Sequence, residues 1–374
     1  MDLTETLTWL VDTPSPYGHE AELCSAIAER LATSHPEDSM QRVGNGLVAG
    51  HREGRPLMLL VGHIDTVPHQ GQPPAYIEDG RLHGLGSTDM KAGIAVMLHL
   101  LEDEAVRLGP YDVVGVFYDR EEGPVEENQL RTILDAVPWL TEAEFGIVLE
   151  PTDLQLELGC NGAMNIAVRF KGKSSHSARP WLGVNAIDKA IPLLTKLAER
   201  GPVSHIQGGM EFLEVMSPTL ARGGVARNII PKDFEFNVSY RFPPTLTVDE
   251  AEAKFREIAS EADELEFVDR APAAPVPEGN RHLTRLEDIT KAPQHPKQGW
   301  TDVARLAEYG IAAVNYGPGE TALAHQVEES VELEEHGTLG MMPGTMILVM
   351  IFLLAFVVYY FANWKLLSAM WQIG

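Results

Sequence analysis

A histidine and an aspartate two residues apart, His63 and Asp65, are the first pair in this sequence that could do chemistry. They follow the apolar run Leu57–Val61, which predicts a buried strand. Alternate side chains of an extended chain point the same way, so we expect both to face one site. A carboxylate that orients an imidazole is typical of metal-bound histidines. The alternative is a satisfied structural pair, so the interpretation needs support from further residues.

Further acidic and histidine residues share this placement, because each follows an apolar run that predicts a strand or begins a predicted helix. They are Asp89 at the start of a helix over 90–101, Glu121 and Glu122 after 113–118, Glu150 after 145–149, and His325 after 311–316. In open α/β sheets ligands collect beyond the carboxyl ends of strands, so these side chains are expected to meet.

Two imidazoles and several carboxylates suit Zn²⁺, leave a position for water, and leave one carboxylate as a general base. Two metals could share a bridging hydroxide and polarise a carbonyl. The alternatives are a helix N-cap for Asp89 and solvated surface acids for the others.

The elements that must position these residues alternate between strands and helices, which predicts an α/β fold with a mostly parallel sheet. Residues 165–170 and 234–240 instead alternate apolar and polar positions, and helices are predicted at 185–199 and 249–262. We therefore predict a catalytic domain of residues 1–158 and 271–335, interrupted by an inserted α+β domain at 159–270. Two domains suit a chain of 374 residues.

The composition limits the classes of partner. The net charge is −25, from 54 acidic and 29 basic residues, which argues against nucleic acid. Two cysteines, Cys24 and Cys160, are too few for a disulfide framework and favour a reducing, cytoplasmic compartment. The first five residues contain neither a basic nor an apolar region, so we expect no signal peptide.

The C-terminal region predicts a transmembrane helix at 340–366. No Asp, Glu, Lys or Arg occurs from His336 to Trp364, and the stretch is apolar nearly throughout from Gly344. About 20 apolar residues suffice to span a bilayer as a helix, and aromatic residues often mark its ends. A buried core helix is the alternative. This segment predicts membrane association and an anchored catalytic domain.

Five motifs, in order and spacing, resemble the dinuclear zinc aminoacylase/carboxypeptidase superfamily. They are Gly62–Pro68, Gly86–Gly93, Glu121–Gly123, Leu149–Thr152 and Ser175–Pro180. The resemblance covers roughly residues 3–332 and implies a zinc-exopeptidase-type catalytic domain with an inserted ferredoxin-like lid and dimerisation domain. Within the superfamily the sequence is most similar to succinyl-diaminopimelate desuccinylases of the actinobacterial type. The apolar C-terminal tail departs from the family pattern.

The resemblance implies two zinc ions per chain, with Co²⁺ as a substitute. The implied ligands are His63 and Glu150 for one ion, Glu122 and His325 for the other, and Asp89 as the bridge. By the same resemblance Asp65 orients His63, and Glu121 is the general base.

The implied substrate contacts are His176, Asn228, Arg241 and Gly319, and the position of His176 implies a homodimer. The implied reaction removes succinate from N-succinyl-L,L-diaminopimelate, a step of lysine and diaminopimelate biosynthesis. Another N-acyl amino acid is the nearest alternative, by acetylornithine deacetylation or carboxypeptidase action. A non-catalytic, membrane-tethered accessory protein is the alternative from another class.

Overall fold

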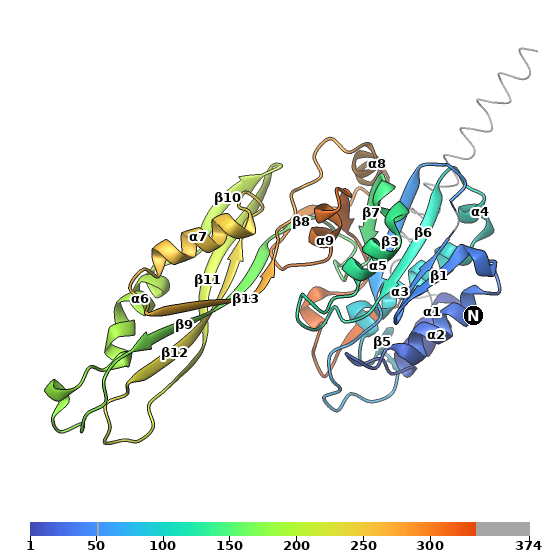
Figure 1. Cartoon of the computed structure of the whole chain (residues 1–374). Helices are drawn as coiled ribbons and strands as arrows, with labels where there is room; N and C mark the ends of the chain where they lie inside the picture. The colour runs from blue at the N-terminus through green and yellow to red at the C-terminus, as the bar shows by residue number, and fades with distance from the viewer. Residues whose placement is uncertain (51, 334–374) are drawn as a thin grey trace, which may run out of the picture. The chain divides into compact units, whose positions relative to one another are not determined.

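A computed structural model of the chain describes residues 1–50 and 52–333 (Figure 1). The predicted transmembrane segment at 340–366 lies outside the described residues. Among the residues that are described, no helix is long and apolar enough to cross a membrane.

The chain divides into two compact units. Unit 1 contains Met1–Glu157, Gly279–His295 and the described residues from Leu306 onward, whereas unit 2 contains Leu158–Glu278 and Pro296–Arg305. The limits of the catalytic and inserted domains at residues 158, 270 and 335 stay a prediction.

The larger sheet is built mainly by unit 1 and has eight strands. Their spatial order is β1 (Met40–Val43), β2 (Gly46–Ala49), β6 (Asp112–Tyr118), β3 (Leu57–His63), β7 (Phe145–Val148), β15 (Ala313–Asn315), β8 (Leu156–Cys160) and β14 (Gln294–Lys297). In its centre β3 runs parallel to both β6 and β7, and β15 runs parallel to β7. At one side of the sheet, β2 runs antiparallel to both β1 and β6. The mostly parallel α/β sheet predicted from the buried strand runs is confirmed.

Helices pack around this sheet (Figure 1). They are α1 (Leu3–Asp12), α2 (Ala21–Leu31), α3 (Ala92–Glu102), α4 (Glu104–Arg107), α5 (Leu130–Ala136), α8 (Arg281–Thr290) and α9 (Val303–Glu308). Helix α3 and the turn before it approach β3 so closely at Gly62 that a Cβ there would lie 2.7 Å from the side chains of Ile94 and Met90. A smaller sheet in unit 1 has the order β16 (Ser330–Glu332), β5 (Arg81–His83), β4 (Tyr76–Glu78).

Unit 2 holds a five-stranded sheet with the order β10 (Val203–Gln207), β11 (Met210–Gly223), β12 (Asp233–Phe242), β9 (Gly162–Lys171), β13 (Glu264–Ala271). All four strand pairs are antiparallel. Helices α6 (Ala186–Arg200) and α7 (Val248–Ile258) share one apolar core with β9 and β12, so both cover the same face of the sheet. This arrangement confirms the predicted inserted α+β domain. Helix α7 ends four residues earlier than the predicted boundary at 262.

Candidate metal centre

The carboxyl ends of the central parallel strands carry most of the candidate residues. His63 is the last residue of β3, Glu121 and Glu122 follow β6, and Glu150 follows β7. His325 comes ten residues after β15, beyond a short helical turn at Thr321–Leu323. Because these strands run parallel, their ends deliver the side chains to one edge of the sheet.

Asp89 reaches the same place from a different element. It lies in an irregular turn, Ser87–Lys91, which precedes α3 and in which Asp89 and Met90 have non-helical backbone angles. The Asp89–Met90 peptide is cis. The N-cap interpretation of Asp89 is wrong, since α3 begins only at Ala92 and its N-cap position, Lys91, makes no side-chain capping bond.

Two overlapping groups of potential ligands share Asp89. Within each group, one donor atom per residue lies within 4.8 Å of the others. One group is His63, Asp89 and Glu150, and the other is Asp89, Glu122 and His325. A third group combines His63 with Glu121 and Glu122. We call the six residues of these groups the ligand cluster.

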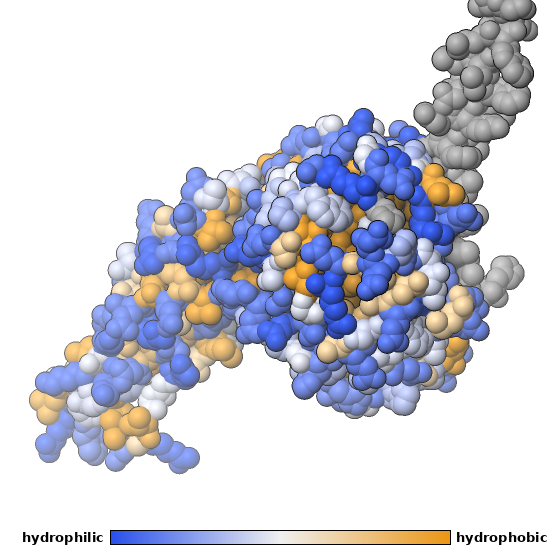
Figure 2. All heavy atoms as spheres, turned by 45° about the vertical axis from the view of Figure 1, so that its right-hand side comes forward, coloured by the Kyte–Doolittle hydropathy of each residue, from blue (hydrophilic) through white to orange (hydrophobic). Residues whose placement is uncertain are grey.

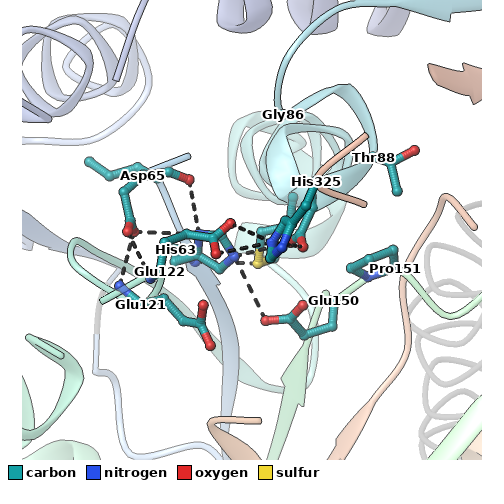
Figure 3. Close-up of polar contacts among 12 residues, drawn as sticks. His63, Asp65, Gly86, Thr88, Glu121, Glu122, Glu150, Pro151 and His325 are labelled. Atoms are coloured by element: carbon teal, nitrogen blue, oxygen red, sulfur yellow. Dashed lines mark hydrogen bonds and ion pairs between the residues drawn. The ribbon is translucent and has the colours of Figure 1, made fainter. Parts of the chain in front are cut away.

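Four side chains of the ligand cluster point toward one another in Figure 3, namely those of His63, Glu122, Glu150 and His325. His63 Nε2 lies 3.2 Å from Asp89 Oδ1 and 3.9 Å from Glu150 Oε1. His325 Nε2 lies 3.0 Å from Glu122 Oε1 and 3.4 Å from Asp89 Oδ2. Each imidazole therefore contacts a different oxygen of Asp89, as a carboxylate placed between two cations would allow.

Asp65 stands behind the cluster and is fully buried. Its backbone oxygen lies 3.1 Å from His63 Nδ1, and its carboxylate oxygen Oδ1 lies 3.4 Å away. The same carboxylate accepts hydrogen bonds from the backbone N–H groups of Glu121 and Glu122, at 3.1 and 3.0 Å. Asp65 thus fixes the orientation of one imidazole and the start of the loop that carries two acids.

Protons compensate the charge of the cluster in the metal-free protein. Burial by itself would lower the pKa of His63, but Asp65 and Asp89 raise it well above its ordinary value. Hydrogen bonds to Asp89 and Glu122 raise the pKa of His325 to about 10. Burial would raise the pKa of Asp89, but the imidazoles of His325 and His63 lower it. The carboxylates therefore favour positive charge at the position between them.

The donor set fits a divalent metal ion. Imidazole nitrogens and carboxylate oxygens are the ligands that Zn²⁺ takes from proteins, and each three-residue group leaves room for a non-protein ligand. A bound cation would replace the protons that the two histidines hold.

The predicted substrate contacts are divided between the two units. Gly319, in unit 1, packs on Thr88 beside the Asp89 turn, since a Cβ there would lie 3.0 Å from the Thr88 side chain. In unit 2, exposed His176 forms a β-bridge with Ile229 and lies next to exposed Asn228.

Arg241 lies near the far end of β12 from those two residues. Its register partner on β9 is Ala163, whereas Asp233 at the start of β12 pairs with Lys171. Eight residues of an antiparallel strand span about 27 Å. His176 and Arg241 of one chain are therefore too far apart to hold the same small carboxylate.

Sequence reasoning missed one buried residue beside the cluster, Glu329. It is 1% exposed and accepts a hydrogen bond from the backbone N–H of Asp89 at 2.9 Å. Its sequence neighbourhood, Glu328-Glu329, is a pair of acids like many solvated ones. The one available signal is its position just before a short strand, four residues after His325.

Solved structures share this fold at low sequence identity. An aminopeptidase PepT from Bacillus cereus matches with a TM-score of 0.74 and 19% identity, over 93% of this chain and 96% of that one. The YxeP protein of Bacillus subtilis, described as a dinuclear metal-binding peptidase, matches with a TM-score of 0.65 and 19% identity, over 94% and 97% of the two chains. These matches support the two-part fold.

Two curated relatives are more similar in sequence. A Mycobacterium tuberculosis protein, provisionally named succinyl-diaminopimelate desuccinylase DapE, is 36% identical over 332 residues, which is 88% of this chain and 93% of the relative. The succinyl-diaminopimelate desuccinylase of Corynebacterium glutamicum is 32% identical over 334 residues, or 87% and 90% of the two chains.

The family assignment depends on both findings. The model of peptidase family M20/M25/M40 matches residues 59–341, which includes every residue of the ligand cluster. The curated relatives match over most of their own length as well. The chain therefore belongs to peptidase family M20/M25/M40.

Proposed function

We propose that this protein hydrolyses the amide of N-succinyl-L,L-diaminopimelate, releasing succinate and the free diamine. The observation that carries the proposal is the pair of three-residue ligand groups that share Asp89. A carboxylate oxygen of Glu121 also lies within 4.8 Å of a ring nitrogen of His63. The names of the relatives at 36% and 32% identity support the choice of the acyl group.

Two zinc ions would be held by the ligand cluster, with Co²⁺ as a substitute. His63 and Glu150 would bind one ion, Glu122 and His325 the other, and Asp89 would bridge them, which agrees with the two groups that share Asp89. When bound, such ions supply Lewis-acid polarisation of a carbonyl and a nucleophile at neutral pH.

The protein's own groups would move the proton and hold the charge. Glu121 takes a proton from the attacking water and delivers it to the departing amine. Asp65 keeps Glu121 in reach, because it anchors the backbone N–H of that residue at 3.1 Å. His176 would donate a hydrogen bond to the oxygen that becomes negative during attack.

Recognition of the carboxylates requires local positive charge, because the chain as a whole carries −25. Arg241 offers a guanidinium that could bind a carboxylate through two parallel hydrogen bonds. It is partly buried, and this burial lowers its pKa. Asn228 and the backbone near Gly319 would add further hydrogen bonds.

A homodimer would resolve the separation of His176 and Arg241. Since one chain holds them at opposite ends of β12, His176 would act at the site of a second copy. The surface of unit 2 supports such pairing, and Figure 2 shows hydrophobic side chains gathered in several places on it. Residues 217–223 of β11 are all exposed, and β10 pairs only with 210–214 of that strand.

The dimer surface can be tested with two kinds of variant. Leu220 on the open edge of β11 is 72% exposed, and Ile191 on α6 is 52% exposed. Leu220→Lys and Ile191→Glu are expected to convert a dimer into monomers, measured by light scattering after size exclusion. Ile206→Glu, at a 64% exposed position on β10, is the control and should stay dimeric. Dimers in all three variants would place the interface elsewhere.

A reducing, cytoplasmic location for the two units agrees with the state of the cysteines. Cys24 and Cys160 are both free and buried. Burial raises the pKa of each thiol to about 11, which keeps both unreactive.

The deciding experiment compares two substrates with the full chain loaded with zinc. Amine release is measured from N-succinyl-L,L-diaminopimelate and from N-acetylornithine, side by side, and again after chelation. We expect zinc-dependent hydrolysis of the succinyl substrate and little of the acetyl one. Activity on acetylornithine alone would keep the chemistry and change the acyl group. No hydrolysis with two zinc ions bound would point to a peptide substrate, whereas a chain that binds no zinc would favour the accessory-protein alternative.

A further inference from the structure

Glu329 binds the backbone of the turn that carries Asp89. Its Oε1 accepts hydrogen bonds from the N–H groups of Thr88 and Asp89, at 3.0 and 2.9 Å. Its Oε2 accepts one from the N–H of Gly86 at 3.0 Å. One buried carboxylate thus satisfies three amides of a single short turn, which runs beside the ligand cluster in Figure 3.

This turn cannot satisfy those amides by itself. Gly86 has a positive φ of 78°, and Asp89 has φ −115° and ψ 100°, so the chain does not continue a regular helix here. Buried backbone N–H groups need acceptors, and leaving one without a partner is unfavourable. Glu329 therefore determines whether the irregular turn, and with it the Asp89 carboxylate, keeps its place.

The segment around Glu329 is attached to the turn at further points. The hydroxyl of Thr88 donates to the backbone oxygen of Ser330 at 2.7 Å. The N–H of Gly84 donates to the backbone oxygen of Glu329 at 3.1 Å. His325 precedes this segment and lies 3.4 Å from Asp89. The stretch 325–330 therefore supplies one potential ligand, His325, and holds the turn that carries another, Asp89.

We propose that Glu329 is a positioning residue that holds Asp89 between His63 and His325 before any metal binds. The inference rests on the proposed metal centre, and it adds a part that the ligand set does not contain. Asp89 belongs to both three-residue groups, so a displacement of its turn loosens both. Residues that orient ligands typically change metal affinity by about 10–100-fold when replaced.

Glu329→Gln is the sharpest variant, because it keeps the size of the side chain and changes its hydrogen bonding. Three N–H donors converge on two acceptor oxygens in the native protein. A glutamine amide has one acceptor oxygen, and its NH₂ group would face a donor. Glu328→Gln is the matched control, since the neighbouring glutamate is exposed and the substitution removes the same charge.

The first measurement uses the metal-free protein, so it does not depend on activity. Amide hydrogen exchange of peptides covering residues 84–91 is followed by mass spectrometry. We expect exchange at least about tenfold faster in Glu329→Gln than in the wild type, with no change in Glu328→Gln, because exchange reports local opening. Equal exchange rates in the wild type and Glu329→Gln would overturn the proposal.

The second measurement follows the metal. Competition with a chromophoric chelator should give a zinc affinity about 10–100-fold weaker in Glu329→Gln. The visible spectrum of the cobalt-loaded protein should shift as well, which a loss of stability alone would not cause. Unchanged affinity and spectrum would overturn the proposal. If Glu329→Gln does not fold, Glu329→Asp carries the same test, since it keeps both oxygens but is one carbon shorter.

The two proposals fail in different ways. A wild-type chain that binds no zinc or cobalt would contradict the proposed function, while hydrogen exchange would still test the anchoring of the turn. A wild-type chain that binds two metals, together with a Glu329→Gln variant that binds them equally well, would contradict only the role of Glu329.

Discussion

Two buried groups of charged side chains, one in each unit, differ in how their carboxylates are compensated. The group in unit 2 surrounds one carboxylate, Glu214 on β11, which is fully buried. Its oxygens lie 2.7 Å from the Tyr240 hydroxyl, 2.8 Å from Lys254 Nζ, 3.0 Å from His205 Nε2 and 3.1 Å from an Arg200 nitrogen. We call these five residues the Glu214 cluster. The ligand cluster of unit 1 instead combines four carboxylates with two imidazoles.

The two clusters differ more in the source of their positive charge than in their burial. Burial would raise the pKa of Glu214, but hydrogen bonds from Lys254, Tyr240 and His205 lower it. Permanent cations of the protein thus compensate this carboxylate. In the ligand cluster the positive charge comes from protons on His63 and His325, which a metal can replace. The first cluster is complete without a ligand, and the second favours a cation.

The largest expected effect concerns the catalytic step at Glu121. Glu121→Gln should lower kcat by up to about 10⁴-fold while both metals stay bound, because glutamine cannot accept the proton that a general base transfers. The measurement is steady-state hydrolysis together with zinc content. Glu126→Gln, at an exposed position in the same loop, is the control and should keep normal turnover.

The same variant tests a different role for Glu121. Its carboxylate lies in one potential ligand group with His63 and Glu122. Loss of a zinc ion from Glu121→Gln would make this residue a ligand and leave the base unassigned. Near-normal turnover with both metals bound would exclude it from proton transfer.

The next effect is on stability and belongs to the other cluster. Glu214→Ala leaves the partly buried Lys254 and Arg200 without their carboxylate and the buried Tyr240 hydroxyl without its acceptor, so it should lower the free energy of unfolding by about 3–5 kcal/mol. Urea unfolding measures this, and zinc content should not change. Glu211→Ala, at an exposed position on the same strand, should cost less than about 1 kcal/mol. A Glu214→Ala variant as stable as this control would remove the structural role of the cluster.

Metal removal should act only on the ligand cluster. With free zinc at about 10²–10³ times its Kd, chelation should lower the free energy of unfolding by about 3–4 kcal/mol, because only the fold brings the residues of the ligand cluster together. The free-energy effects of sites that share no residue usually add, so Glu214→Ala should lose the same amount on chelation as the wild type. Thermal unfolding of both proteins with and without chelator checks this. Stability that does not respond to chelation would mean that the ligand cluster, too, is complete without a metal.

The ligand cluster could be predicted because its signals are local. Fully apolar runs predicted β3, β6 and β7, and parallel strands deliver the residues after them to one edge. The predicted helix after Asp89 began two residues too early, since tertiary contacts of Asp89 and Met90 hold that turn out of helical geometry. Periodicity cannot report such contacts.

The anchoring residues could not be predicted, because their partners are distant in sequence. Glu329 accepts a hydrogen bond from a backbone N–H 240 residues away in the sequence. Nearly every residue has a backbone N–H, so the residue types do not indicate which one is the partner. Glu214 has partners on four other elements of unit 2. One signal for it existed, since Phe212, Glu214 and Met216 occupy the buried positions of the alternating strand β11. A charged residue on the buried side of a strand predicts that partners exist and does not identify them.

The smallest effect is the pH dependence of the Glu214 contribution. Because the folded pKa of Glu214 is lowered, its carboxylate stabilises the fold at pH values above the unfolded pKa of about 4.3. This stabilisation disappears as the pH falls through the folded pKa, since protonation removes the charge in the fold as well. The difference in unfolding free energy between the wild type and Glu214→Gln should therefore be largest near pH 7 and shrink below about pH 4.

Measuring the difference between two proteins is essential, because another buried acid acts in the opposite direction. Burial and the nearby Glu20 raise the pKa of Asp119 to about 6, so that residue destabilises the fold as the pH rises from about 4 to 6. Asp119 is present in both proteins and cancels in the comparison. Urea unfolding at several pH values then isolates Glu214. A difference that does not change with pH would mean that Glu214 has the same pKa folded and unfolded, and that size rather than charge explains its place in unit 2.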